Sequence, residues 1–226
     1  MSTGYNAVLE RLKEERKRWN WTQEEMSQKL WLTQGHYNKI ENGFKRLSYR
    51  QLHRLYGIGV DIYYIITGKR NNGQFDKEIF KNCDDLEAYA LCQITYAVLR
   101  VLIQKRRNSC EVERRIINTN YILSNKATGK SFWVLLRESN DLKQEQMARV
   151  LGINIKKYRN LERGLFLSDS EIMYQVCDCF QISPFLILSE NNFITDEICS
   201  ILCEVDYDIR NALFEYLKLG YDKFMI

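Results

Sequence analysis

The stretch TQEEMSQKLWLTQGHYNKIENG, residues 22–43, has a looser counterpart in KQEQMARVLGINIKKYRNLERG, residues 143–164. Identical residues recur 121 positions apart, while the residues between them differ. We infer that the chain carries one small structural element twice, with a changed surface. The matching pairs include Gln23 and Gln144, Met26 and Met147, Leu30 and Leu151, Tyr37 and Tyr158, Glu41 and Glu162, and Gly43 and Gly164.

Local signals in the first stretch predict two short helices joined by a turn. Thr22, with Glu25 three residues later, is a capping box that begins one helix, and Thr33 can cap the next. The second helix should end at Gly43, because glycine takes the left-handed conformation there without strain. Apolar residues at helical spacing are expected to point inward. They are Met26, Leu30, Leu32, Tyr37 and Ile40 in the first stretch and Met147, Leu151, Ile153, Tyr158 and Leu161 in the second.

The repeat extends to five helices on each side. Before the first stretch, Leu9, Leu12 and Trp19 mark one face of a helix; after it, Ser48 and Asp61 can cap two more. In the second half, helices are expected over SFWVLLRES (131–139), over 143–150, after Asn154, from about residue 169 or 170, and after Ser183. By the last helix the offset has become 122, since VDIYYII (60–66) matches ISPFLIL (182–188).

A polar linker and a further helical segment separate the two halves. The apolar stripe of this segment is too wide for a free linker helix, so we expect it to pack on the two units, on a helix near 114–123 or on a second chain. Two short helices are expected after residue 191. The stripe consists of Leu86, Tyr89, Ala90, Ile94, Ala97, Val98, Val101 and Leu102.

The predicted fold is therefore all-α, with two five-helix units joined by a helical middle segment and followed by short C-terminal helices. The expected domains are 1–70, a linker or dimerisation segment 71–130, a second unit 131–190, and a tail 191–226. No apolar run approaches the roughly 18 residues of a membrane span, and the charged start lacks a signal-peptide core. These features predict a cytoplasmic protein with no membrane contact.

The net charge of +4 is unevenly distributed along the chain. Residues 1–70 carry 13 basic and 7 acidic side chains, a net +6, whereas residues 191–226 carry 3 basic and 7 acidic ones, a net −4. A polyanion partner at the N-terminal end fits this gradient.

Residues 21–43, WTQEEMSQKLWLTQGHYNKIENG, resemble the helix-turn-helix of the Cro and phage-repressor class, often called XRE-like. The resemblance covers residues 8–67 and, more loosely, 131–189. It implies the lambda-repressor-like fold of five short helices and binding to double-stranded DNA. Trp31 departs from the pattern, because the turn usually has glycine there, as the second copy does at Gly152.

The outward positions of each copy are the candidate DNA contacts. Amide side chains can pair with adenine, lysine can bind guanine or phosphate, and cations beyond the glycine can hold the backbone. A glutamine at the start of the preceding helix resembles the phosphate-contacting glutamine of the family. The candidates are Gln23, Thr33, Gln34, His36, Asn38, Lys39, Lys45 and Arg46 in the first copy, and Gln144, Lys156, Lys157, Arg159 and Asn160 in the second.

The second copy differs after its glycine, where Leu165, Phe166 and Leu167 replace Phe44, Lys45 and Arg46. An exposed apolar loop is more typical of a protein contact than of a phosphate contact. Whether this copy binds DNA, or serves packing or dimerisation, is left open.

We interpret the chain as a sequence-specific DNA-binding transcription regulator that uses one or both units in the major groove. The alternative is an antitoxin- or antirepressor-like module that binds another protein. No catalytic grouping, phosphate-binding loop or zinc-ligand spacing is present, so we expect no enzyme activity, no cofactor and no metal. The sequence leaves open a homodimer through the middle helices and any small-molecule effector.

Overall fold

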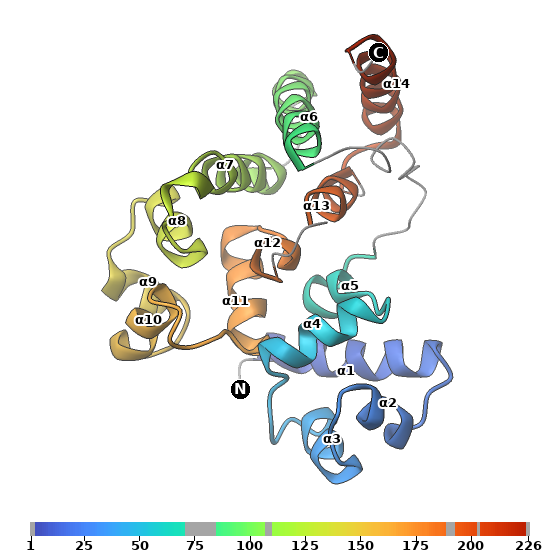
Figure 1. The fold of residues 1–226 in the computed structure, drawn as a ribbon, viewed down its shortest axis with the longest axis vertical. Helices are drawn as coiled ribbons and strands as arrows, with labels where there is room; N and C mark the ends of the chain where they lie inside the picture. Colours follow the sequence, from blue (N-terminus) through green and yellow to red (C-terminus); the bar gives the residue numbers. More distant parts are fainter. Residues whose placement is uncertain (1–2, 71–84, 107–109, 189–192, 203, 225–226) are drawn as a thin grey trace.

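A computed structural model describes residues 3–70, 85–106, 110–188, 193–202 and 204–224. Within these residues the regular elements are helices, as predicted, and one isolated β-bridge joins Ser48 to Asp169. Figure 1 shows two groups of short helices side by side, with the remaining helices gathered at one end. No helix among the described residues is long and apolar enough to cross a membrane.

Five helices make up the first unit: α1 (Thr3–Arg18), α2 (Gln23–Lys29), α3 (Gln34–Glu41), α4 (Tyr49–Gly57) and α5 (Ile62–Thr67). Four of the predicted caps are present, since the side chains of Thr22, Thr33, Ser48 and Asp61 each accept a hydrogen bond from a backbone N–H of the helix that follows. The prediction for Trp19 is wrong: it follows the end of α1, is exposed and stacks on Trp21. Helix α1 instead buries Tyr5, Val8, Leu9 and Leu12.

Helices of the same order follow in the second unit: α8 (Phe132–Ser139), α9 (Gln144–Val150), α10 (Ile155–Glu162), α11 (Ser170–Phe180) and α12 (Pro184–Leu188). Each begins at or close to its predicted position. Helix α8 is half the length of α1, and its first residue stands where Arg11 lies in α1, since 132 − 121 is 11. Helix α7 packs against α8 and covers it.

The middle and tail helices are α6 (Asp85–Arg106), α7 (Cys110–Ser124), α13 (Phe193–Leu202) and α14 (Tyr207–Phe224), with a 3-10 turn at Lys126–Thr128. Helix α6 packs on α7, α13 and α14. Arg115 of α7 lies buried beneath them and donates hydrogen bonds to Glu197 and Glu204. The middle segment and the tail therefore form one helical layer over the second unit's α11 and α12.

The face by which α6 packs differs from the predicted stripe. Its buried residues are Leu91, Cys92, Thr95, Tyr96 and Leu99. Of the predicted stripe, Ala90, Ile94, Ala97 and Val101 are exposed and Val98 is half-buried, while the side chains of Leu86, Tyr89 and Leu102 lie outside the described part. The helix is apolar on both faces, so periodicity alone chose the wrong one. Self-association through this segment stays a prediction.

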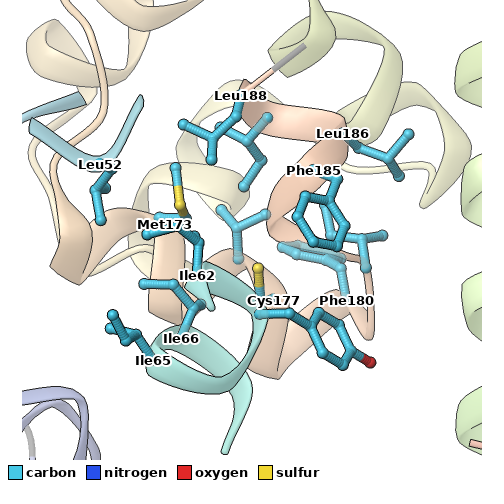
Figure 2. Packing of buried hydrophobic residues seen from close by; sticks show 14 of the residues in the cluster. Leu52, Ile62, Ile65, Ile66, Met173, Cys177, Phe180, Phe185, Leu186 and Leu188 are labelled. Carbon is cyan, nitrogen blue, oxygen red and sulfur yellow. The ribbon is translucent and has the colours of Figure 1, made fainter. Parts of the chain in front are cut away.

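The two units pack on each other through an apolar core. Helix α5 contacts α11 and α12, and α4 contacts α12. Figure 2 shows Ile62, Ile65 and Ile66 of α5 close to Met173 and Cys177 of α11, with Phe185 and Leu188 of α12 beside them. Burial of these side chains stabilises one shared arrangement of the units rather than two freely tethered domains.

Candidate nucleic-acid interface

Helices α2 and α3 meet at a left-handed turn. Trp31 has a φ of +56°, and Gly152, 121 residues later, has a φ of +59°. The turn is thus the same in both units, although a bulky residue occupies it in the first. The Trp31 side chain is 82% exposed, and the Arg54 guanidinium of α4 lies over its ring. The inward residues of both units are buried or packed on the core as predicted, from Met26 to Ile40 and from Met147 to Leu161.

A buried carboxylate fixes α3 against α1 and α2. Glu41, 3% exposed, accepts hydrogen bonds from Arg16 Nε, Gln23 Nε2 and the Tyr37 hydroxyl, each at 2.7 Å. Burial raises the pKa of Glu41, but the bonds from Arg16, Gln23 and Tyr37 outweigh it and hold the pKa below its ordinary value. The carboxylate therefore stays charged and holds three helices in register.

The second unit repeats this arrangement at an offset of 121. Glu162 accepts hydrogen bonds from Arg137 Nε at 2.7 Å and from Gln144 Nε2 at 2.5 Å. Tyr158 differs from its counterpart, because its hydroxyl donates to the Trp133 carbonyl at 3.0 Å. Tyr158 also interacts with Glu162, and burial together with this carboxylate raises the pKa of the Tyr158 hydroxyl.

Most of the candidate DNA contacts of the first unit are exposed. Thr33, Gln34, Asn38, Lys39, Lys45 and Arg46 are exposed, and His36 and Gln23 are half-buried. Thr33 also caps α3 by accepting from the His36 N–H at 3.2 Å.

Two of these side chains are engaged within the unit. Gln23 donates to Glu41 and accepts from Asn38 Nδ2 at 3.3 Å, while Asn42 Nδ2 donates to Asn38 Oδ1 at 3.0 Å. This chain of amides orients the Asn38 side chain on the outer face of α3 and leaves its position defined before any ligand binds.

Arg46 pairs with Glu171 of α11, across the boundary between the units. The sequence suggested a phosphate contact for this residue, and the structure adds an ion pair that joins the units. Lys45, its neighbour, is exposed.

In the second unit the candidate residues are less uniformly exposed. Lys156 and Arg159 are exposed, whereas Gln144, Lys157 and Asn160 are half-buried. Arg159 Nε donates to Gln144 Oε1 at 3.2 Å, the counterpart of the Asn38–Gln23 bond. Lys157 lies over the Phe166 ring and 3.8 Å from Asp169.

Sequence reasoning missed Arg16 and Arg137, which position α3 and α10 through Glu41 and Glu162. The sequence could have pointed to these two arginines, because they are 121 residues apart, the offset that relates the two repeated stretches. It also missed Arg50, an exposed cation at the start of α4. Among the described residues, no cluster of three or more His, Cys, Asp or Glu side chains could hold a metal ion.

A groove of about 650 Å³ opens between the loops that follow α3 and α10. Phe44, Lys45 and Arg50 line it from the first unit, and Leu165 and Leu167 from the second. Phe44 and Leu165 are counterparts at the offset of 121 and are 80% and 73% exposed. Exposed apolar and cationic side chains thus share one face, at the boundary of the two units.

Comparison with known proteins finds a match for part of the first unit. A family model described as helix-turn-helix matches residues 12–55, from α1 into α4. That family is one of DNA-binding domains of transcription regulators. No curated protein and no solved structure matches the chain.

Proposed function

We propose that the chain is a sequence-specific regulator of transcription that binds double-stranded DNA with α3 in the major groove. The observation that carries the proposal is the exposed ridge of Gln34, Asn38 and Lys39 on a helix of the matched region. The ion pair between half-buried Arg16 and buried Glu41 holds this helix in place. An α-helix fits the width of the major groove. Asn and Gln can bond adenine through two hydrogen bonds, and lysine can bond guanine.

Contacts to the DNA backbone would flank this ridge. Gln23 and the exposed backbone amides at the start of α2 suit one phosphate, Thr33 at the start of α3 another, and Lys45 a third. Arg46 would reach a phosphate by leaving Glu171, and His36, half-buried, would contribute at the edge of the ridge.

We assign a second recognition helix to α10. Its exposed cations Lys156 and Arg159 suit guanine or phosphate, and Lys157, Asn160 and Gln144 would add contacts at its edges. The proposed domains are accordingly 1–70, 71–130, 131–190 and 191–226, and the described helices of the second and fourth, α6, α7, α13 and α14, pack together as a covering layer. This assignment supposes that the helix-turn-helix occurs twice.

Selection of bound duplexes from a random pool tests the proposal. We expect a defined sequence motif, lost from one part of the site in Asn38→Ala and Lys39→Ala but retained in Lys126→Ala, an exposed cation away from α3. Affinity should fall steeply with salt, with a slope of about −0.9 per phosphate contact. A pool that shows no enrichment would overturn the proposal.

The exposed apolar residues Phe44, Leu165 and Leu167 favour one second candidate, a module that binds another protein through this face. Binding of such a partner would bury apolar surface and depend little on salt. A partner captured with no salt dependence, together with a pool that shows no enrichment, would support this candidate over DNA binding.

A further inference from the structure

Residues that correspond in the two units touch one another. Ser48 and Asp169 form an antiparallel bridge, and they are 121 residues apart, the offset that relates α2–α3 to α9–α10. Tyr63 and Phe185 stack at a centroid distance of 5.9 Å with ring planes 13° apart, and they are 122 residues apart, the offset that relates α5 to α12.

Contact between counterparts is a property of two-fold symmetry. If a rotation exchanges the two units, a residue that meets its own counterpart must lie on the axis of that rotation. A head-to-tail arrangement, as in a direct repeat, brings unlike surfaces together instead. Two such pairs, one just before α4 and α11 and one in α5 and α12, define a local two-fold axis that runs from Ser48 and Asp169 to Tyr63 and Phe185.

Helix contacts around this axis are reciprocal. Helix α4 corresponds to α11, and α5 corresponds to α12. The contact of α5 with α11 is matched by the contact of α12 with α4, and α5 also contacts α12 directly. The backbone adds a bond from Ser170 N to the Leu47 carbonyl at 2.9 Å, and Ser170 Oγ accepts from Leu47 N at 3.2 Å. The relation is approximate, because Arg46–Glu171 has no equivalent: the counterparts of these residues are Leu167 and Arg50.

The two ends of the axis differ. At the Ser48–Asp169 end lies the groove with Lys45 and Arg50, and Figure 1 shows α3 and α10 on either side of the loops that form it. At the Tyr63–Phe185 end lies the layer of α7 and α13, and α13 belongs to the tail segment 191–226, whose net charge is −4. A polyanion fits the first end, where Lys45 and Arg50 are exposed, better than the second, which the covering helices occupy.

We infer that one chain acts as a built-in dimer that occupies both halves of a single operator, with the half-sites inverted and unlike in sequence. The inference rests on the proposed function. Duplex DNA has local two-fold axes perpendicular to its helix axis, so two recognition helices related by a two-fold axis contact half-sites in inverted orientation, about one helical turn apart. Covalent linkage replaces the self-association by which such a pair otherwise forms.

The unlike residues on the two helices predict how the half-sites differ. Asn38 of α3 corresponds to Arg159 of α10, and both are exposed and hydrogen-bonded to the glutamine that begins the preceding helix. Asparagine favours adenine and arginine favours guanine. The two halves should therefore carry adenine and guanine at the same place relative to the centre.

The test combines site selection with stoichiometry for the full chain. From a random duplex pool we expect two inverted, unlike half-sites with centres about 10 base pairs apart. Sedimentation of the protein with a labelled duplex that bears one such site should give one chain per bound duplex at saturation. Asn38→Ala should abolish base preference in one half-site only, and Arg159→Ala should abolish it in the other half-site only. Each substitution should lower affinity about tenfold or more.

The outcomes separate the two proposals. Enrichment of a direct repeat, of a single half-site or of a symmetric site with two chains per duplex would overturn the built-in dimer and leave DNA binding intact. Absence of any enriched motif would overturn DNA binding itself. In a further variant, Arg159→Asn, the second half-site should shift towards the sequence of the first, and an unchanged motif would count against α10 as a recognition helix.

Discussion

The first and second units share a frame and differ in the faces that the frame presents. Arg16, Gln23 and Glu41 recur as Arg137, Gln144 and Glu162, with bonds of nearly equal length. Around this frame, Asn38 becomes Arg159 and Arg46 becomes Leu167. The buried polar contacts hold α3 and α10 in place, and the outer surface of each helix is free to change because it contributes little to that placement.

The largest expected effect comes from removing the buried charge. Glu41→Gln places an amide N–H₂ among the donors of Arg16, Gln23 and Tyr37, so it should destabilise the first unit by about 3 kcal/mol. Glu162→Gln places the same amide among Arg137, Gln144 and Tyr158, so we expect a loss of similar size in the second unit. Hydrogen exchange of amides in α2–α3 and in α9–α10 can measure each loss separately. A loss in one unit only would mean that the two carboxylates do not hold their units in the same way.

The Glu41 carboxylate also predicts that the protein loses stability at acid pH. The folded-state pKa of Glu41 is lowered from 4.5, chiefly because bonds from Arg16, Gln23 and Tyr37 outweigh the effect of burial. Its contribution is therefore complete above pH 4.5 and is lost as the pH falls through the folded-state pKa. The stability difference between the native chain and Glu41→Gln, from urea unfolding, should shrink across that range. A difference that stays constant would show that Glu41 is not the group that titrates.

The sequence predicted the helices of the two units better than the long-range side-chain contacts that join them. Caps such as Thr22 and inward residues such as Met26 and Met147 follow from local signals, because a cap and a helical period are set within a few residues. The Arg16–Glu41 pair spans 25 residues and the Arg46–Glu171 pair spans 125, and no local rule joins such residues. The recurrence of Arg16 as Arg137 was the available signal.

For α6 the local signal was misleading. Ile94 and Val101 fit the apolar period as well as Leu91 and Leu99 do, and only packing on α13 and α14 decides which face is buried. The candidate site was easier, since surface position on α3 follows once the inward residues are known. Which of its residues contact DNA is a property of the complex and stays a prediction.

The loops after α3 and α10 provide a smaller test of the comparison. Lys45→Ala should weaken binding to all duplexes by about 1 kcal/mol and reduce the salt slope by about 0.9, because a phosphate contact carries no sequence information. Leu167→Lys adds a cation at an exposed position of the other loop and should strengthen binding by a similar amount. Titrations of specific and unrelated duplexes at several salt concentrations measure both. No response to Leu167→Lys would place that loop away from the DNA.

The turn between the two helices should give the smallest effect. Trp31 and Gly152 have nearly the same left-handed φ, and a Cβ built on Gly152 would meet only Gln175 Nε2 at 3.5 Å, an ordinary contact. Gly152→Ala should therefore cost only the backbone strain of about 1 kcal/mol. Trp31→Gly relieves that strain but loses the stacking of Arg54, worth about 0.5–1 kcal/mol at an exposed site, so its net effect should be close to zero.

Trp31→Ala separates the two contributions at this turn, because it keeps the strained backbone and removes the ring. Thermal unfolding should rank Trp31→Ala below both the native chain and Trp31→Gly, by about 0.5–1 kcal/mol. Adding Arg54→Ala should abolish the difference between the native chain and Trp31→Ala, since the stacking partner is then absent from both. If Trp31→Gly proved clearly more stable than the native chain, the Arg54 contact would contribute nothing, and the tryptophan would be retained at this exposed turn for a contact outside the chain.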